Sequence, residues 1–314
     1  ISILVKDGSD NHELHYHDIG DYLSQKEKLA IISGFADVSR LDWQKIIPDE
    51  NNDWLNQRDS NYQKYDSLAG ESTSVFNNNS MGILTSRDAW VYGYSKEKVA
   101  QNTERLVQNY NNELKRLKNI PVNERKDLLN RKSNHINWSR KLERFAANDI
   151  ELEYHQSHLK LSLYRPFTKK WVYHDKALNE EARLYYNKFG QNNLVINTTG
   201  RGATRDFSPL VVDCIPSNDF MEKGQGFMRY DNEENNSLLE FPKDNMNQQF
   251  ADKLGLSLDD TFSYVYGLLN SREYQEKYSN DLKKDIARIP VVKNIEKYVE
   301  ILLSGPELYL CKQS

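Results

Sequence analysis

The sequence contains only 2 cysteines and no long apolar run. Cys214 and Cys311 lie far apart, and neither belongs to a Cys-x-x-Cys pair, so the sequence predicts no disulfide framework and no thiolate metal site. No stretch of about 18 apolar residues is present. The N-terminal residues ISILVKDGSD lack the basic-then-apolar order of a signal peptide. We therefore expect a soluble cytoplasmic protein with no membrane association.

Motifs for nucleotide chemistry are also missing. The sequence has no Gly-x-x-x-x-Gly-Lys-Ser/Thr loop, and residues 200–205, GRGATR, supply only Gly-x-Gly, which is too little for a dinucleotide-binding fingerprint. Its 8 prolines never stand in pairs, whereas the amino-methyltransferase family is known for an Asn/Asp-Pro-Pro-aromatic loop that grips a flipped base. We expect neither nucleotide hydrolysis nor methyl transfer from this chain.

Histidines and acidic residues form no recognisable metal site. The run HELHYH at 12–17 lacks the i, i+4 histidine pair of zinc proteases. His155 and His158 have no nearby cysteine and no nearby carboxylate other than Glu151 and Glu153, so we do not expect them to bind a metal ion. The strings ELK at 113–115 and DLK at 281–283 could end a nuclease motif, but no second carboxylate is placed to support either. The sequence therefore predicts no catalytic residue and no metal ligand.

Charge is unevenly distributed along a chain whose net charge is only -4. Residues 96–144 hold 13 Lys/Arg against 6 Asp/Glu, and residues 160–205 hold 9 against 3. Residues 206–260 are acidic, with 4 Lys/Arg against 12 Asp/Glu. A basic segment can simply be a solvated surface, but two adjacent basic segments favour a polyanionic partner.

Periodicity predicts helices on both sides of a strand-rich centre. Near the N-terminus, a short strand, a turn at Gly20 and a helix capped by Ser24 with Glu27 are expected. A longer helix follows Ser95, because its apolar residues recur with a helical period. Further helices are expected at 122–130, 138–147, 250–257, 259–290 and 293–305, and short strands at 159–167, 170–175, 193–199 and 209–215.

This order of elements predicts an α+β fold with a small mixed or antiparallel sheet in the centre, flanked by helical parts. The length of 314 residues allows two or three subdomains. We predict a connector at 1–75, a helical part at 76–150, a β-rich part at 151–235 and a C-terminal helical part at 236–314.

Several runs resemble a known family and occur in the expected order. They are HYHDIGDYLSQKEKLA, TSRDAWVYGYSKEKVAQN, LYRPFTKKWVYHD, NLVINTTGRGATRDFSPLVVDCIPSNDF, GQGFMRYD and DDTFSYVYGLLNSREYQEKYSNDLKKDIARIP. Together they resemble the C-terminal specificity region of single-chain type ISP restriction-modification enzymes, with its connector from the methyltransferase domain. The resemblance covers nearly the whole chain and implies that nuclease, helicase-like ATPase and methyltransferase parts precede Ile1. S-adenosylmethionine, ATP and Mg²⁺ are then expected for the full enzyme and no cofactor for this part.

The resemblance implies double-stranded DNA as a partner. It suggests that Arg165, Lys169 and Lys170 meet phosphates, while Trp171 and Tyr173 mainly fill the core. Arginine can recognise guanine and asparagine can recognise adenine, so polar residues in loops between strands are the best candidates for base contacts. These candidates are Asn197, Thr198, Thr199, Arg201, Thr204, Arg205 and Gln225, and Arg183 is a candidate for a contact to the DNA backbone.

Two hypotheses follow for function. In the first, the chain is a non-catalytic, sequence-specific DNA-recognition module that positions an attached adenine methyltransferase and a motor-nuclease. In the second, it is an interaction scaffold that docks on the methyltransferase domain of the same polypeptide, and DNA contacts come from elsewhere. The loop at 197–205 can equally be a plain flexible hairpin loop.

Overall fold

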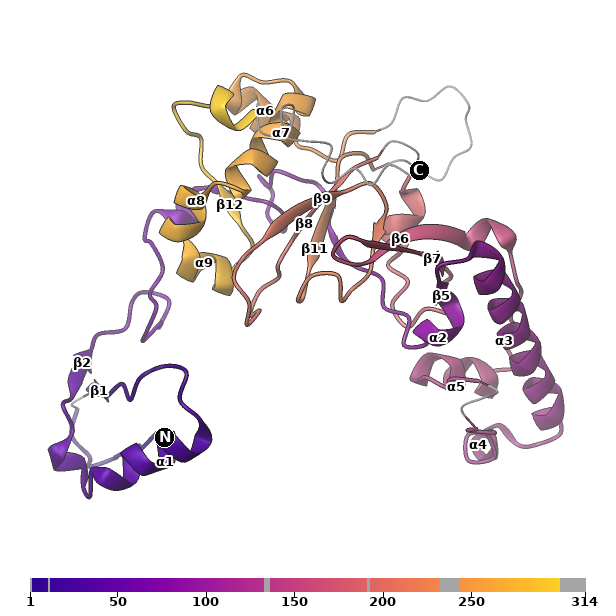
Figure 1. The fold of residues 1–314 in the computed structure, drawn as a ribbon, viewed down its shortest axis with the longest axis horizontal. Helices are drawn as coiled ribbons and strands as arrows, with labels where there is room; N and C mark the ends of the chain where they lie inside the picture. The colour runs from indigo at the N-terminus through magenta and orange to yellow at the C-terminus, as the bar shows by residue number, and fades with distance from the viewer. Residues whose placement is uncertain (1, 11, 133–135, 191–192, 232–242, 300–314) are drawn as a thin grey trace. The chain divides into compact units, whose positions relative to one another are not determined.

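A computed structural model of the chain describes residues 2–10, 12–132, 136–190, 193–231 and 243–299 (Figure 1). The chain divides into two units, residues 1–60 and 61–314. Both contain helices and strands, and the predicted α+β class is confirmed. The finer division into four parts stays a prediction.

The N-terminal unit is built around one strand pair and one helix. Strand β1 (Leu14–Tyr16) pairs antiparallel with β2 (Gln44–Ile46), and α1 (Gln25–Gly34) lies between them in the sequence. Ser24 caps α1 and Glu27 reaches back to the Ser24 backbone N–H, so the predicted capping box is confirmed. A short 3₁₀ turn, η1 (Val38–Arg40), follows. No described residue of this unit is fully buried, so the unit has little core of its own.

The second unit contains two four-stranded sheets. One has the strand order β10-β6-β7-β5 and is mixed, because β10 pairs parallel with β6; the other has the order β4-β11-β8-β9 and is antiparallel. A two-stranded sheet joins β3 and β12. The bounds are β3 (Asp66–Ser67), β4 (Ser80–Met81), β5 (Tyr92–Gly93), β6 (Leu159–Arg165), β7 (Thr168–Tyr173), β8 (Val195–Thr198), β9 (Pro209–Val212), β10 (Ile215–Pro216), β11 (Gln225–Met228) and β12 (Arg288–Ile289).

Helices precede and follow these sheets in the chain. Ser95 caps the 22-residue α3, whose apolar stripe is buried as predicted. The helix expected at 122–130 is shorter, and residues 296–299 are helical, while 300–305 of the last expected helix lie outside the described residues. The bounds are α2 (Asp88–Val91), α3 (Lys96–Leu117), α4 (Val122–Arg125), α5 (Arg140–Ala147), α6 (Gln248–Leu254), α7 (Leu258–Leu269), α8 (Arg272–Lys277), α9 (Ser279–Lys284), and the 3₁₀ turns η2 (Tyr62–Lys64), η3 (Gln156–His158) and η4 (Leu184–Lys188).

The antiparallel sheet is buried on both faces, between two hydrophobic cores. Because successive side chains of a strand point to opposite faces, Val195 joins the first core and Ile196 the second. Strands β9 and β11 alternate in the same way. Figure 1 shows β8, β9 and β11 between the group α6–α9 and the group that contains β5–β7 and α2–α5. Burial on both faces explains why these strands are nearly continuous apolar runs.

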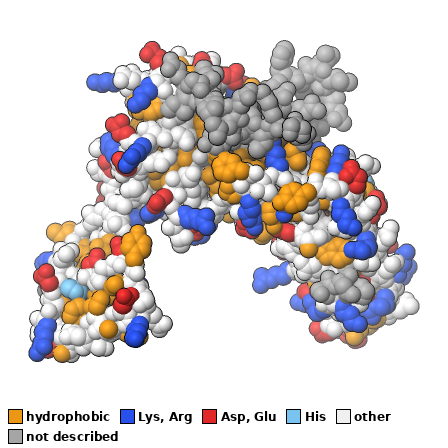
Figure 2. Space-filling model, viewed as in Figure 1, with side chains coloured by type: hydrophobic (Ala, Val, Ile, Leu, Met, Phe, Trp, Pro, Cys, Tyr) orange, Lys and Arg blue, Asp and Glu red, His pale blue; other side chains and the backbone are white. Residues whose placement is uncertain are grey.

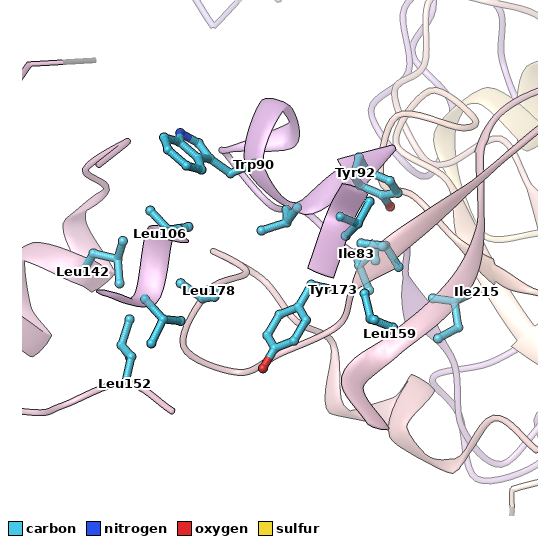
Figure 3. Close-up of a cluster of buried hydrophobic side chains, with 14 of the residues drawn as sticks. Ile83, Trp90, Tyr92, Leu106, Leu142, Leu152, Leu159, Tyr173, Leu178 and Ile215 are labelled. Carbon is cyan, nitrogen blue, oxygen red and sulfur yellow. The ribbon is translucent and has the colours of Figure 1, made fainter. Parts of the chain in front are cut away.

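The first core gathers α3, α5 and the mixed sheet (Figure 3). Trp90 and Tyr92 are buried there. Of the two residues that were expected to fill the core, Tyr173 is fully buried and Trp171 is partly buried against the same core. Arg87 is also buried, and its guanidinium donates to the Asn137 carbonyl at 3.3 Å, to the Ser139 hydroxyl at 2.7 Å and to the Leu178 carbonyl. Burial lowers the pKa of Arg87 to about 10, although the Glu180 charge opposes this shift. Arg87 therefore joins three chain segments inside the fold.

Candidate nucleic-acid interface

The loop at residues 199–208, between β8 and β9, is tightly braced. Thr199 and Ser208 close its base, because the Thr199 N–H donates to the Ser208 carbonyl at 3.1 Å and the Ser208 N–H donates to the Thr199 hydroxyl at 3.0 Å. The Gly202 N–H donates to the Lys283 carbonyl at 2.8 Å. Gly202 has a φ of 69°, a left-handed conformation in which glycine carries no strain. These bonds anchor the loop at its base and to the end of α9.

One carboxylate holds the middle of this loop. Glu222 accepts hydrogen bonds from the backbone N–H groups of Thr204 at 2.9 Å and Arg205 at 3.1 Å. These donors hold the pKa of the Glu222 carboxyl below its ordinary value. The neighbouring Gly200 lies so close to the Lys223 backbone that a Cβ atom would overlap its carbonyl oxygen. The segment before β11 thus fixes the loop through both backbone and side chain.

Arg201 and Arg205 extend from this braced loop into solvent. Both are exposed, and among the described residues neither guanidinium has a hydrogen-bond or ion-pair partner. A guanidinium that faces solvent on a fixed backbone can bind a planar acceptor pair without first breaking an internal ion pair.

Two of the loop candidates lie inside the sheet. Asn197 and Thr198 belong to β8 and are 3% and 4% exposed. Asn197 lies beside Gly226 of the neighbouring strand, where a Cβ atom would approach its side-chain oxygen to 3.0 Å. Gln225 pairs with Thr198 and its side-chain oxygen accepts a hydrogen bond from Asn79 at 2.9 Å. These residues support the base of the loop, and the exposed part begins at Thr199.

A second group of cations lies on aromatic rings beside the β6–β7 hairpin. The Arg165 guanidinium lies 4.3 Å and the Lys170 ammonium 3.7 Å from the centre of the Tyr164 ring. Lys170 also lies 5.1 Å from the ring of Tyr94, which is 75% exposed. The Tyr164 hydroxyl donates to Asp88 at 2.8 Å, and this bond raises the pKa of Tyr164. These cation–π contacts hold both side chains in place, and an aromatic ring, unlike a carboxylate, does not neutralise the cation that it contacts.

Lys169 lies in a different environment from its neighbour. Its ammonium is 2.8 Å from Asp213, and its side chain is only 15% exposed. Arg165, in contrast, is 42% exposed and reaches Asp219 only at 3.9 Å. The cationic run therefore divides into an ion pair at Lys169 and two cations held on aromatic rings, Arg165 and Lys170.

Arg183 lines an open pocket of about 400 Å³ together with Lys141 and Lys176. Glu181 is the carboxylate of this pocket and lies 3.5 Å from the Arg183 guanidinium. Lys141 donates to the Asn179 carbonyl at 2.7 Å, and burial lowers its pKa. The pocket lining thus contains three cationic side chains and one carboxylate, a balance that favours an anionic ligand.

Sequence analysis did not identify Lys141, Lys176, Tyr94 or Glu222 as candidates. Each is placed in the candidate interface by contacts with residues that are distant in the chain. Figure 2 shows that Lys and Arg predominate over the part of this face that holds α3–α5, whereas both signs mix over α6–α9. Among the described residues, no group of three or more His, Cys, Asp or Glu could hold a metal ion. Within the same residues, every helix is too short or too polar to cross a membrane.

The family of the chain follows from residues 74–310, which match the family model of the Type ISP C-terminal specificity domain. The chain belongs to this family. A search of curated proteins finds no match.

Solved structures agree with this assignment. A nuclease-deletion mutant of the Type ISP restriction-modification enzyme LlaGI, in complex with a DNA substrate mimic, is 41% identical with a TM-score of 0.87, over 99% of this chain and 29% of that chain. The ATP-dependent Type ISP enzyme LlaBIII, bound to DNA, is 30% identical with a TM-score of 0.82, over 96% of this chain and 20% of that chain. DrdV, in a DNA complex, shares the fold at 24% identity and a TM-score of 0.80, over 95% of this chain and 31% of that chain. The chain spans less than a third of each.

Proposed function

We propose that this specificity domain recognises a particular sequence in double-stranded DNA. The observation that carries the proposal is the braced loop at 199–208, which holds Arg201 and Arg205 in solvent with no partner among the described residues. A base-reading arginine needs this combination, because its two N–H donors must meet guanine O6 and N7 in a fixed geometry. The DNA complexes of LlaGI and LlaBIII support the same conclusion.

The remaining candidates divide by their surroundings. Arg165 and Lys170 contact phosphates, because both cations are held on aromatic rings and not in a close ion pair like that of Lys169. Arg183 contacts the DNA backbone from the pocket that it shares with Lys141 and Lys176. Lys169, Asn197, Thr198, Thr199, Thr204 and Gln225 act indirectly, by holding strands and loop in place.

We also propose that the chain acts within a longer polypeptide. It spans 29% of LlaGI and 20% of LlaBIII, which leaves room for a methyltransferase, an ATP-driven motor and a nuclease. Binding energy from this chain then holds the duplex while an adenine is flipped into the methyltransferase. S-adenosylmethionine, ATP and Mg²⁺ would be bound by those other parts.

The test is selection of duplexes from a randomised DNA library by the chain at moderate salt, followed by sequencing of the retained DNA. We expect enrichment of one asymmetric motif. Retention of DNA without any enriched motif would contradict autonomous recognition. Loss of all DNA binding, together with binding to a methyltransferase domain, would instead support the scaffold hypothesis.

A further inference from the structure

A hydrogen-bonded turn after β7 forms one side of the pocket that contains Arg183. The Asp175 carboxylate accepts hydrogen bonds from the backbone N–H groups of Ala177 at 2.7 Å and Leu178 at 3.0 Å. Lys176 lies inside this turn and lines the pocket. Its side chain is exposed, and its ammonium has no hydrogen-bond or ion-pair partner among the described residues. The turn therefore presents an unpaired cation on a fixed backbone.

Lys141, from α5, lines the pocket beside this turn. Its ammonium donates to the carbonyls of Asn179 at 2.7 Å and Lys176 at 3.2 Å. These two bonds hold the lysine side chain against the turn. Because an ammonium has three N–H donors, one donor remains for a ligand.

The charge of Lys141 is incompletely compensated within the fold. Burial lowers its pKa, and the nearby charges of Arg87 and Arg144 act in the same direction. The carboxylates of Glu180 and Glu181 act in the opposite direction without cancelling the shift. An anion beside this ammonium would favour its charged form, because an opposite charge raises the pKa of a lysine.

Arg183 lines the pocket from the residue directly before η4. Its side chain is 29% exposed, and its contacts are long: Nη1 lies 3.5 Å from the Glu181 carboxylate and Nη2 lies 3.9 Å from the Met81 sulfur. A guanidinium has five N–H donors, so these contacts leave an N–H group on each Nη atom for a ligand. The pocket thus brings together available donors from three separate segments of the chain.

We propose that this pocket binds one phosphate group, held jointly by Arg183, Lys141 and Lys176. The lining carries these three cations against the single carboxylate of Glu181, and arginine and lysine donors at separate places can meet different oxygens of one phosphate. The pocket is open and has a volume of about 400 Å³, so a phosphate can enter it while joined to a longer chain. Under the proposed DNA recognition, on which this inference rests, the phosphate occupies one defined position of the DNA backbone.

Replacement of single phosphates in the selected target duplex tests this site. The duplex carries one uncharged methylphosphonate at each position in turn, and its affinity is measured for the parent and three variants. Arg183→Asn removes the guanidinium and places a residue that tolerates the φ of 52° at this position. Lys176→Ala removes an exposed side chain and keeps the turn. Arg272→Ala is the control, because Arg272 is exposed on α8, outside the pocket lining.

For the parent, we expect one methylphosphonate position to weaken binding about tenfold, as loss of a charge-assisted bond does. The loss at that position should shrink in Arg183→Asn and in Lys176→Ala, because the cations that hold the phosphate are reduced in number. Arg272→Ala should show the same loss as the parent. Thermal unfolding of each variant checks its folding, and Lys176→Ala alone decides the outcome if Arg183→Asn does not fold.

Inorganic phosphate without DNA separates the two sources of a phosphate group. It is titrated into the parent and the same variants, and the rise in Tm is compared with that in sodium chloride of equal ionic strength. A phosphate-specific rise in the parent that Lys176→Ala reduces, without any methylphosphonate position that depends on the pocket, would assign the site to a free phosphate and overturn its assignment to DNA.

Two other outcomes distinguish the pocket from the proposed function. A parent chain that selects its target, with neither duplex nor inorganic phosphate binding dependent on Arg183 or Lys176, would overturn the phosphate site and leave DNA recognition intact. A parent chain that selects no duplex contradicts the proposed function, and the titration with inorganic phosphate then decides the pocket by itself.

Discussion

Thr204 donates to Glu222 through both its backbone N–H, at 2.9 Å, and its hydroxyl, at 3.1 Å. The two residues are 18 positions apart in the chain, and the bond ties the exposed loop to the segment before β11. Because Arg205 also donates to Glu222 from its backbone, a single carboxylate sets the path of the loop that carries both free arginines.

Glu222→Ala should therefore release the loop without unfolding the domain. We expect faster amide exchange at Thr204 and Arg205, measured by hydrogen–deuterium exchange, and weaker selection of the DNA target. Since the folded-state pKa of Glu222 is lowered, its contribution is complete above its ordinary pKa and disappears as pH falls through the lowered value. After correction for the intrinsic slowing of amide exchange at low pH, the protection of these amides should fall on acidification in the parent and not in the variant.

Arg201→Ala and Arg205→Ala test base recognition. A residue that reads a base should cost about 1 to 3 kcal/mol on the cognate duplex and relax the requirement at one position. Competition binding against single-base variants of the selected site measures both effects. Arg272→Ala is the matched control, because Arg272 is exposed on α8 and, among the described residues, forms an ion pair with Glu276 alone. Equal losses on every duplex would assign the two arginines to phosphates.

Lys169 and Lys170 should differ although they are adjacent. Lys170→Ala removes a cation held on aromatic rings and should reduce the magnitude of the slope of log affinity against log salt by about 0.9. Lys169→Ala should leave this slope unchanged and instead lower the free energy of unfolding by about 1 to 3 kcal/mol, because it breaks the bond to Asp213. Salt titrations and urea unfolding of both variants measure these effects. The reverse pattern would contradict the assignment of roles.

Arg87 should matter for folding and not for DNA. Arg87→Ala leaves the buried Leu178 carbonyl without its donor, at a cost of about 1 to 3 kcal/mol, and also removes the bonds to Asn137 and Ser139. Arg87→Lys should recover only part of this stability, because an ammonium cannot reproduce the guanidinium fork. Chemical unfolding measures the loss, and near-normal stability of Arg87→Ala would show that water replaces these bonds.

Local order was predictable because it depends on neighbours in the sequence. The cap at Ser95 and the apolar stripe of α3 need only residues within a few turns, and the strands β6 to β9 follow from short β-rich runs between Pro, Gly and Asn. The family resemblance added the DNA-facing interpretation.

The sequence alone determined that this is an α+β chain with basic segments and without a recognised catalytic motif. Only the tertiary structure decided which polar residues are available to a partner. Asn197 and Arg201 are four positions apart, yet one is buried between strands and the other is exposed. Lys169 is paired because folding brings Asp213, 44 positions away, next to it. Pairing and burial depend on which distant segments meet, and local sequence carries little information about this.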